Sequence, residues 1–363
     1  MVKVVGIDPG TKSFDLCGLD DGKVFLEKSI DSADIAEDPG IVIDALKSAG
    51  DLDVIVGPSG YGLPLTHISQ VGDKEYFEMI LVKPEDKKTG VLVGLSKLVK
   101  LMAKENLNVF FIPGVIHLKT VPEHRKANKI DLGTPDKLCS ATLGVYDQSK
   151  RLGINYEQTS FIMVEIGFAF NAIIGVEKGK IISGIGGTSA GPAFVAQGKM
   201  DGELAYLLDS FSKDTLFKGG AKSIMNQTTI TPEEFAKKHN SSEKLSIAWE
   251  AMMEGIEREV ASMKVVVKKP REILTSGRLS SLPEIKNEIS IRLTKYGDVR
   301  EVQGFAKNVK ESSQGAALIA DGLAGGNHRK LVEVLDIHGA SGSVLDHIHL
   351  VKIDEMKKKY SLI

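Results

Sequence analysis

The sequence has few cysteines, almost no net charge and no long apolar run. Its two cysteines, Cys17 and Cys139, lie far apart and neither belongs to a Cys-x-x-Cys pair, which argues against a disulfide framework and a zinc site. The formal net charge is only −2, so the chain lacks a broad basic surface and no nucleic acid is expected as a partner. No apolar run approaches the ~20 residues of a membrane span and no signal peptide is recognisable, so we expect a cytoplasmic protein with no membrane partner.

The rest of the composition is that of an ordinary folded protein. Hydrophobic residues make up 42% of the 363 residues and charged residues 26%, which excludes a disordered chain, a coiled coil and collagen. A domain usually contains ~100–200 residues, so the length predicts two domains.

The first part of the chain alternates strands with turns and then with a helix. Apolar runs predict strands at residues 2–7, 13–19, 23–30 and 52–57, and a helix is expected near residues 40–49. Strands that are followed by alternating helices and strands predict a mixed sheet covered by helices.

This opening pattern recurs later in the chain. Strands are expected at residues 160–166, 169–176 and 180–183, and Glu165 stands 157 positions after Asp8, near the end of the first strand of its copy. A duplicated unit is the simplest account of this repeat. It predicts two domains, at residues 1–155 and 156–363, with the ligand in the cleft between them.

Each copy carries an acidic residue and a glycine where its first strand ends. Residues 8–13 read Asp-Pro-Gly-Thr-Lys-Ser, and residues 165–167 read Glu-Ile-Gly. Backbone N–H groups in such a turn can face an anion while glycine allows its close approach, although an isolated Asp-Pro-Gly sequence is also a common plain turn. We therefore predict that the two hairpins clamp a polyphosphate, with Asp8 and Glu165 holding its Mg²⁺ ion. The predicted phosphate-binding residues are Gly10, Thr11, Lys12 and Gly167.

Two later motifs suit the rest of a nucleotide, for which ATP is the expected identity. A predicted strand at residues 271–275 breaks at Ser-Gly-Arg before a helix, which would place amides and a helix N-terminus beside a ligand; an ordinary strand-to-helix turn is the alternative. Gly315 lies among small residues of a helix predicted at residues 312–323, where either a ligand or close helix packing would explain it. The predicted nucleotide-binding residues are Ser276, Gly277, Arg278 and Gly315.

The order of these motifs resembles the actin-like ATPase superfamily, which includes sugar kinases, acetate and butyrate kinases, heat-shock chaperones and actin. The part that is similar to butyrate kinases comprises residues 179–182, 186–187, 191–194, 198 and 201–204. The whole chain is similar to an archaeal family labelled as predicted butyrate kinases. The resemblance implies a duplicated α/β fold of two ribonuclease-H-like domains with mixed five-stranded sheets and a nucleotide cleft between them. It also implies ATP and Mg²⁺ as cofactors and, by analogy, a homodimer.

Two regions are candidates for the acceptor site. His124 and Arg125 lie in a polar stretch and, as cations, could neutralise a carboxylate acceptor and the transferring phosphoryl group, so they join Asp8 as predicted catalytic residues. A solvated loop is the alternative for this stretch. Ser59, Gly60 and Tyr61 follow a predicted strand and are expected to hold the substrate.

The chain departs from carboxylate kinases at both hairpins. Asp8 stands where those kinases carry asparagine, and residues 167–169 read Gly-Phe-Ala where they usually carry three glycines. The leading prediction is ATP-dependent phosphoryl transfer to a small acceptor, a short-chain carboxylate such as butyrate, to form an acyl phosphate. A sugar or other hydroxyl kinase, favoured by Asp8, and a non-catalytic nucleotide-binding switch, favoured by the altered glycine loop, are the alternatives.

Overall fold

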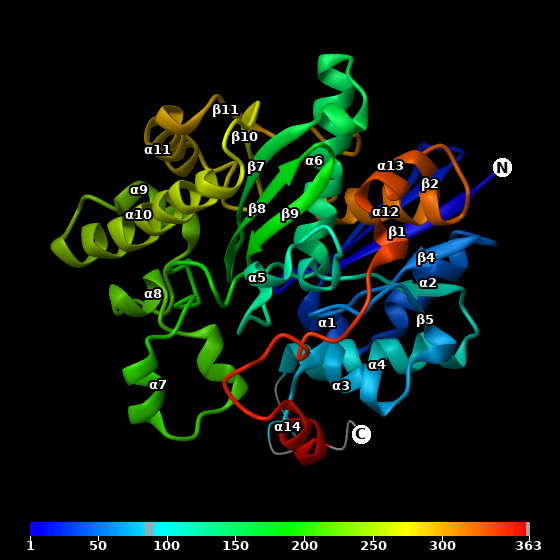
Figure 1. The fold of residues 1–363 in the computed structure, drawn as a ribbon, viewed down its shortest axis with the longest axis horizontal. Coiled ribbons are helices and arrows are strands. Elements are labelled where there is room, and N and C mark those ends of the chain that lie inside the picture. Colours follow the sequence, from blue (N-terminus) through cyan, green and yellow to red (C-terminus); the bar gives the residue numbers. More distant parts are fainter. Residues whose placement is uncertain (84–85, 87–89, 361–363) are drawn as a thin grey trace.

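Two mixed β-sheets lie in separate halves of the molecule, and helices cover their faces (Figure 1). The computed structural model describes residues 1–83, 86 and 90–360. The strands are β1 (Lys3–Pro9), β2 (Ser13–Asp20), β3 (Lys23–Asp31), β4 (Val54–Val56), β5 (Thr66–His67), β6 (Val109–Phe111), β7 (Ser160–Ile166), β8 (Asn171–Glu177), β9 (Lys180–Ile185), β10 (Glu272–Ser276) and β11 (Val299–Glu301). The helices are α1 (Ser32–Glu37), α2 (Gly40–Ser48), α3 (Asp73–Ile80), α4 (Gly90–Lys104), α5 (Glu123–Lys126), α6 (Pro135–Leu152), α7 (Gly202–Leu208), α8 (Ala221–Ile224), α9 (Pro232–Lys238), α10 (Glu243–Val266), α11 (Pro283–Leu293), α12 (Glu311–Leu323), α13 (Arg329–Leu335) and α14 (Ile353–Lys359).

The two sheets repeat one strand order. In the described chain the first sheet has the order β3-β2-β1-β4-β6-β5 and the second has β11-β10-β7-β8-β9. In both sheets the first three strands in sequence pair antiparallel, and the first strand also pairs in parallel with the fourth, as β1 with β4 and β7 with β10. The predicted duplication is therefore present in the fold. The expected five strands are found in the second sheet, whereas the first gains the two-residue edge strand β5.

The period of two along β1 decides where Asp8 points. Val5 and Ile7 belong to the apolar cluster on the outer face of the first sheet. Val4 belongs to the inner cluster, and a Cβ atom at Gly6 would lie 2.2 Å from a backbone atom of α12. Asp8 is the next residue on this inner face.

The same alternation runs along β7. Ile162 and Val164 belong to the outer cluster of the second sheet, whereas Phe161 and Met163 belong to the inner cluster. Glu165 therefore points inward, as Asp8 does.

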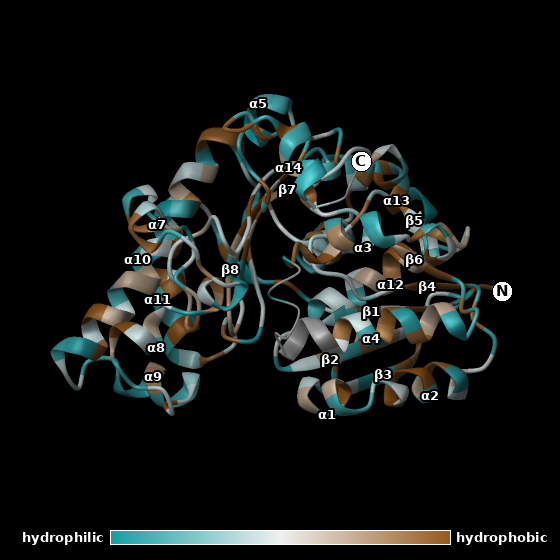
Figure 2. Cartoon of the chain, turned by 90° about the horizontal axis from the view of Figure 1, so that it is seen from below, coloured by the Kyte–Doolittle hydropathy of each residue, from teal (hydrophilic) through white to brown (hydrophobic). Residues whose placement is uncertain are grey.

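Two helices form the inner layer, and each packs on the sheet of the other half of the chain. α6 follows the first sheet in sequence but packs on β7 and β8, whereas α12 follows the second sheet and packs on β1, β2 and β4. These two helices also pack on each other. A division near residue 155 thus separates the two sheets but not the inner helices. Figure 2 shows α1–α4 gathered on one half and α7–α11 on the other.

Both cysteines are buried and unpaired, as expected for structural thiols. Burial, with a smaller contribution from Glu27, raises the pKa of Cys17 to about 12, so its thiol is unreactive at neutral pH. Among the described residues, no helix has the length and apolar character needed to cross a membrane.

Candidate functional site

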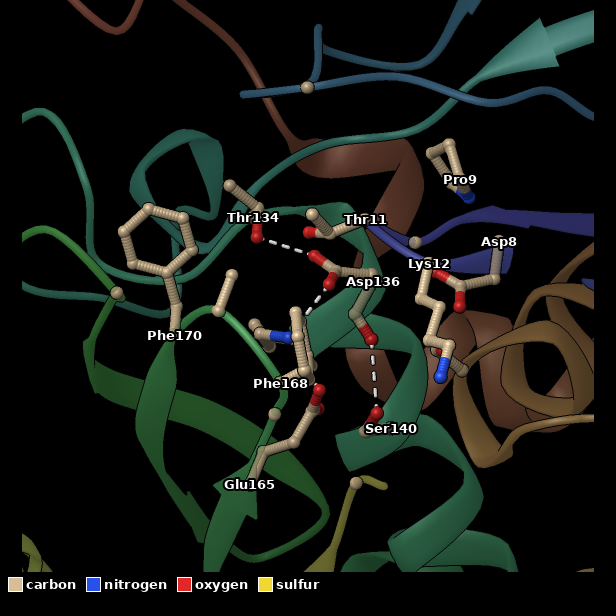
Figure 3. Close-up of a pocket in the computed structure, with 18 of the residues that line it drawn as sticks. Asp8, Pro9, Thr11, Lys12, Thr134, Asp136, Ser140, Glu165, Phe168 and Phe170 are labelled. Atoms are coloured by element: carbon tan, nitrogen blue, oxygen red, sulfur yellow. Dashed lines mark hydrogen bonds and ion pairs between the residues drawn. The ribbon is translucent and has the colours of Figure 1, made fainter. Parts of the chain in front are cut away.

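A cavity of about 220 Å³, here called the central cavity, lies at the carboxyl ends of β1 and β7. Its lining comes from both halves: the β1–β2 turn, the segment after β4, the first turn of α6, the β7–β8 turn, the turn after β10 and the start of α12. Figure 3 shows the side chains of the two hairpins and of α6 converging on this space. The duplicated fold thus brings segments from distant parts of the sequence to one site.

Lys310 neutralises the acidic end of the first hairpin. Its Nζ atom lies 2.9 Å from Asp8 Oδ2 and 2.7 Å from Asp15 Oδ2, and it donates to the Ser13 carbonyl oxygen at 3.0 Å. Burial acts to lower the pKa of Lys310, but the two carboxylates outweigh it and the pKa is raised. Arg278, from the second half, donates to Ser13 Oγ at 3.1 Å. The first hairpin is therefore tied to the turn after β10 and to the start of α12.

Lys137 has the same role at the second hairpin. It forms ion pairs with Glu165 and with Asp136, the latter at 2.8 Å. Burial raises the pKa of Glu165. It acts in the same direction on Asp136, but Lys137 and the hydroxyl of Thr134 outweigh it, so the pKa of Asp136 is lowered. Lys137 thus bridges two carboxyl groups, and Glu165 Oε2 is buried with no hydrogen-bond partner among the described residues.

The two lysines occupy equivalent places in the duplicated fold. Lys310 directly precedes α12 and Lys137 lies in the first turn of α6. Each reaches the next-to-last residue of the strand that its helix covers, Asp8 in β1 or Glu165 in β7. Because both acidic residues point inward, a cation from the inner helix is their natural partner.

Charged side chains of both signs line the cavity in equal number. The basic side chains are Lys12, Lys137, Lys213, Arg278 and Lys310, and the acidic ones are Asp8, Asp131, Asp136, Glu165 and Glu311. Burial raises the pKa of Glu165 and of Glu311, which moves both carboxyl groups toward their neutral forms. The cavity thus combines five basic with five acidic side chains.

The β7–β8 turn presents aromatic rings to the cavity. The Gly167 N–H donates to the Phe170 carbonyl oxygen at 3.0 Å, and a Cβ atom at Gly167 would lie 2.5 Å from that oxygen, so this position requires glycine. Phe168 and Phe170 line the cavity beside it (Figure 3). An apolar surface therefore adjoins the charged groups of the second hairpin.

Lys213 and Tyr61 together form a polar part of the cavity wall. Its Nζ atom lies 3.2 Å from Tyr61 Oη and 4.7 Å from the ring centroid. Burial lowers the pKa of Lys213 to about 8 although Asp131 and Asp86 act to raise it. The backbone N–H and the hydroxyl of Thr188 each donate to Asp131 at 2.9 Å. This wall thus holds an ammonium group that loses its proton near pH 8.

Most of the sequence-predicted site residues come together at the central cavity, and their individual roles stay predictions. Those that line it are Asp8, Gly10, Thr11, Lys12, Ser59, Gly60, Tyr61, Glu165, Gly167, Gly277 and Arg278.

Four predicted residues are not among those that line the cavity. Ser276 is buried, and its Oγ atom has no partner among the described residues. A Cβ atom at Gly315 would lie 1.9 Å from the Cys139 carbonyl oxygen, so this glycine allows α12 to pack against α6. Arg125 lies on α5 and donates to a backbone carbonyl of β9 at 2.8 Å, and His124 is exposed on the same helix.

The cations Lys137, Lys213 and Lys310 were missed by the sequence predictions. Two of them carry a recognisable signal, because a lysine at a helix N-terminus opposes the helix dipole unless an anion compensates it. Lys137 and Lys310 both occupy such positions. Lys213 begins a short 3-10 helix, and nothing in its sequence context marks it.

The carboxylates fit a magnesium ion that is held mainly by phosphates. No group of three or more His, Cys, Asp and Glu side chains is placed to hold a metal within residues 1–83, 86 and 90–360. Mg²⁺ in phosphate-transfer sites, however, often takes only one or two carboxylates besides the phosphates. Asp8 and Glu165 both line the cavity, and the unpartnered Glu165 Oε2 provides one such donor.

Comparisons with known proteins identify a family and a fold. The model of the family described as "Protein of unknown function (DUF1464)" matches residues 6–350. A propionate kinase from Francisella tularensis subsp. tularensis SCHU S4 has a TM-score of 0.62 and 13% sequence identity, over 87% of this chain and 99% of that chain. An acetate kinase from Entamoeba histolytica has a TM-score of 0.57 and 11% identity, over 81% of this chain and 87% of that chain. The acetate kinase of Porphyromonas gingivalis has a TM-score of 0.57 and 12% identity, over 87% of this chain and 98% of that chain. No curated protein sequence matches the chain. The shared fold confirms the predicted two-domain, actin-like α/β class.

Proposed function

The chain belongs to the DUF1464 family, and we propose that it is an ATP-dependent phosphotransferase that acts on a short-chain carboxylate such as butyrate. The fold that it shares with a propionate kinase and two acetate kinases supports this choice of reaction. The observation that carries the proposal is the convergence of the two glycine-bearing hairpins, with basic side chains from both halves of the fold, on the central cavity.

The hairpins and the inner lysines hold the polyphosphate. Backbone N–H groups of Gly10, Thr11 and Lys12 face the phosphates from the first half, and Lys137 and Lys310 offset their charge. Asp8 and Glu165 would hold a Mg²⁺ ion, and this ion would neutralise phosphate charge.

The transfer needs no general base. A carboxylic acid with an ordinary pKa of ~4–4.5 is already ionised at neutral pH. One carboxylate oxygen attacks the γ-phosphorus, a new O–P bond forms, and the bond from the γ-phosphorus to the β,γ-bridging oxygen breaks. ADP leaves with that electron pair, and an acyl phosphate remains. Lys137 and Lys310 stabilise the charge that spreads over the transferring phosphoryl oxygens.

The acceptor lies beside the segment after β4. Ser59, Gly60 and Tyr61 line the cavity there, and Ser59 Oγ is buried without a hydrogen-bond partner among the described residues. A buried hydroxyl without a partner stabilises a bound ligand when a ligand oxygen accepts a hydrogen bond from it. The nearby ammonium of Lys213 supplies the countercharge for a carboxylate.

Hydroxylamine trapping of the acyl phosphate tests this function. Incubation with MgATP and butyrate is expected to yield a hydroxamate and an equal amount of ADP. Arg278→Ala removes a charge-assisted contact worth about 1.5–3 kcal/mol, so kcat/KM should fall at least tenfold. Arg271→Ala, which changes an exposed arginine near the same strand, should retain wild-type activity. ADP release without hydroxamate would refute the carboxylate acceptor.

A non-catalytic nucleotide switch is the second candidate. Phe168 and Ala169 line the cavity where carboxylate kinases, by the sequence resemblance, carry glycines. That role predicts MgATP binding with no ADP release for any acceptor. A hydroxyl kinase would instead release ADP and form a phosphate ester that hydroxylamine does not attack.

A further inference from the structure

A second cavity, here called the tail pocket, adjoins the central cavity. It has a volume of about 350 Å³. Tyr61, Thr188, Lys213 and Leu216 line both spaces. The two cavities are therefore neighbours that share one wall.

The remainder of the tail pocket is mainly apolar. Its walls include Phe77, Leu81, Ile130, Phe211, Leu345 and Met356. Concave apolar surface with a few polar groups at one end is the usual character of a site for a small organic molecule. The tail pocket is similar to such a site: polar groups lie at the shared wall, and Lys83, Asp86 and Ser212 are the other polar residues of its lining.

The C-terminal helix α14 closes one side of the tail pocket. Figure 1 shows this helix beside α3. Tyr360, which follows α14, stacks on Phe77 of α3 with ring centroids 5.0 Å apart. Lys357 pairs with Asp346 at 2.9 Å. Specific contacts therefore hold the wall in place.

The polar groups of the shared wall suit an anionic head. The Lys213 ammonium contacts Tyr61 Oη at 3.2 Å, and the same lysine faces both cavities. A molecule with a carboxylate at one end and an apolar chain at the other could place its head at Lys213 and its chain in the tail pocket. Its carboxylate would then lie on the wall of the central cavity.

We infer that the acceptor is a monocarboxylate with an apolar chain longer than that of butyrate, whose tail occupies the tail pocket. At roughly 30 Å³ for each water-sized group, the 350 Å³ of the pocket corresponds to about twelve such groups, which leaves room for a chain of six or more carbon atoms. This inference rests on the proposed function, because it names the substrate class of the same site. The inference differs from the proposed function in one respect: it predicts that butyrate is a poorer substrate than its longer homologues.

A chain-length series tests the inference. KM would be measured by hydroxamate formation for acetate, butyrate, hexanoate and octanoate. Burial of one methylene is worth about a fourfold change in affinity, so KM should fall about fourfold for each added methylene until the tail pocket is full. A lowest KM for acetate or butyrate overturns the inference while leaving the proposed transferase function intact.

A pocket-filling variant locates the tail. Met356→Trp places a large side chain in the tail pocket and should raise the octanoate KM at least tenfold, and far more than the butyrate KM. Leu350→Trp is the matched control, because Leu350 is 84% exposed on the same C-terminal segment. Equal octanoate KM values in wild type and in Met356→Trp also overturn the inference.

Direct binding separates this inference from the proposed function. Calorimetric titration of octanoate and of butyrate needs no turnover. Tighter octanoate binding that Met356→Trp abolishes supports the tail pocket even if no acyl phosphate forms, in which case only the transferase proposal fails. No binding of octanoate to the wild-type chain, with or without MgATP, overturns the inference.

Discussion

Lys137→Met should destabilise the protein more strongly as the pH rises. The side chains of Lys137 and Glu165 are only 11% and 9% exposed, and removal of one partner of a buried ion pair typically costs about 3–5 kcal/mol. Asp136, the second partner, is 27% exposed and can be partly solvated. We therefore expect a loss near the lower end of that range, about 3 kcal/mol at pH 7.

The direction of the pH effect follows from the two carboxyl groups. Burial raises the folded-state pKa of Glu165 above its ordinary value of 4.5, and Lys137 acts to limit this rise. Without Lys137, the stability present below pH 4.5 is lost as the pH rises toward the higher folded pKa, by up to about 1.4 kcal/mol per pH unit. Lys137 also lowers the pKa of Asp136, so the stability that Asp136 supplies above its ordinary value of 3.8 is lost in the variant. The Glu165 effect widens the difference in free energy of unfolding from wild type as the pH rises, and the Asp136 effect adds a loss that is already complete above about pH 4.

Urea unfolding at pH 5 and pH 8, followed by tryptophan fluorescence, measures this gap. Trp249 is the single tryptophan; it is 3% exposed, and its helix α10 packs on the second sheet, which contains Glu165. The double variant Lys137→Met/Glu165→Gln removes the buried carboxyl group and should recover part of the loss with a flatter pH profile. The reasoning is wrong if Lys137→Met lies within about 1 kcal/mol of wild type at both pH values, since a buried unpaired charge should cost more than that.

Three further outcomes follow from the geometry. Gly315→Ala places a Cβ atom 1.9 Å from the Cys139 carbonyl oxygen and should lower the free energy of unfolding in urea by at least about 2 kcal/mol. The control Gly202→Ala, where no heavy atom lies within 4 Å of the new Cβ atom, should be neutral or slightly stabilising. Equal effects of the two substitutions would contradict the packing role of Gly315. The acceptor KM should be constant below about pH 8 and rise above it as Lys213 loses its proton. Lys213→Arg should remove this rise because a guanidinium stays charged. The same rise in both proteins would exclude Lys213 as its cause. Arg125→Ala should lower stability by about 1 kcal/mol through its lost hydrogen bond and leave kcat unchanged, and a large fall in kcat would restore the catalytic role predicted from the sequence.

The fold was predictable because its signals are local and occur twice. Residues 2–7 and 160–166 are mainly apolar runs, as expected of strands buried on both faces, and the repeat of Asp8 at Glu165 marks the duplicated unit. β5 contains only Thr66 and His67, too few residues to show a period. The packing of α6 and α12 on the sheet of the opposite half was also not predictable, because helix periodicity does not say which sheet a helix covers.

The site was predictable where it depends on backbone turns and not where it depends on distant pairs. The glycine-bearing turns at residues 8–12 and 277–278 both line the central cavity, and their ligand-binding roles stay predictions. The pair of Lys310 with Asp8 joins residues 302 positions apart, and no local pattern connects them. His124 was predicted to be catalytic because it is a potential cation in a polar stretch, but the residues of α5 are not among those that line the cavity.

Calorimetric titration of MgATP into wild type, Lys310→Met and Lys330→Met tests the central claim most directly. Lys330 is the matched control, because its side chain is 61% exposed and pairs only on the surface with Glu157. Tryptophan fluorescence would first confirm that all three proteins are folded. The account predicts one MgATP per wild-type chain, at least tenfold weaker binding by Lys310→Met because a charge-assisted phosphate contact is lost, and wild-type binding by Lys330→Met. Failure of the wild type to bind MgATP, or equal binding by folded Lys310→Met, would contradict the claim that the two hairpins and their inner lysines form a polyphosphate site.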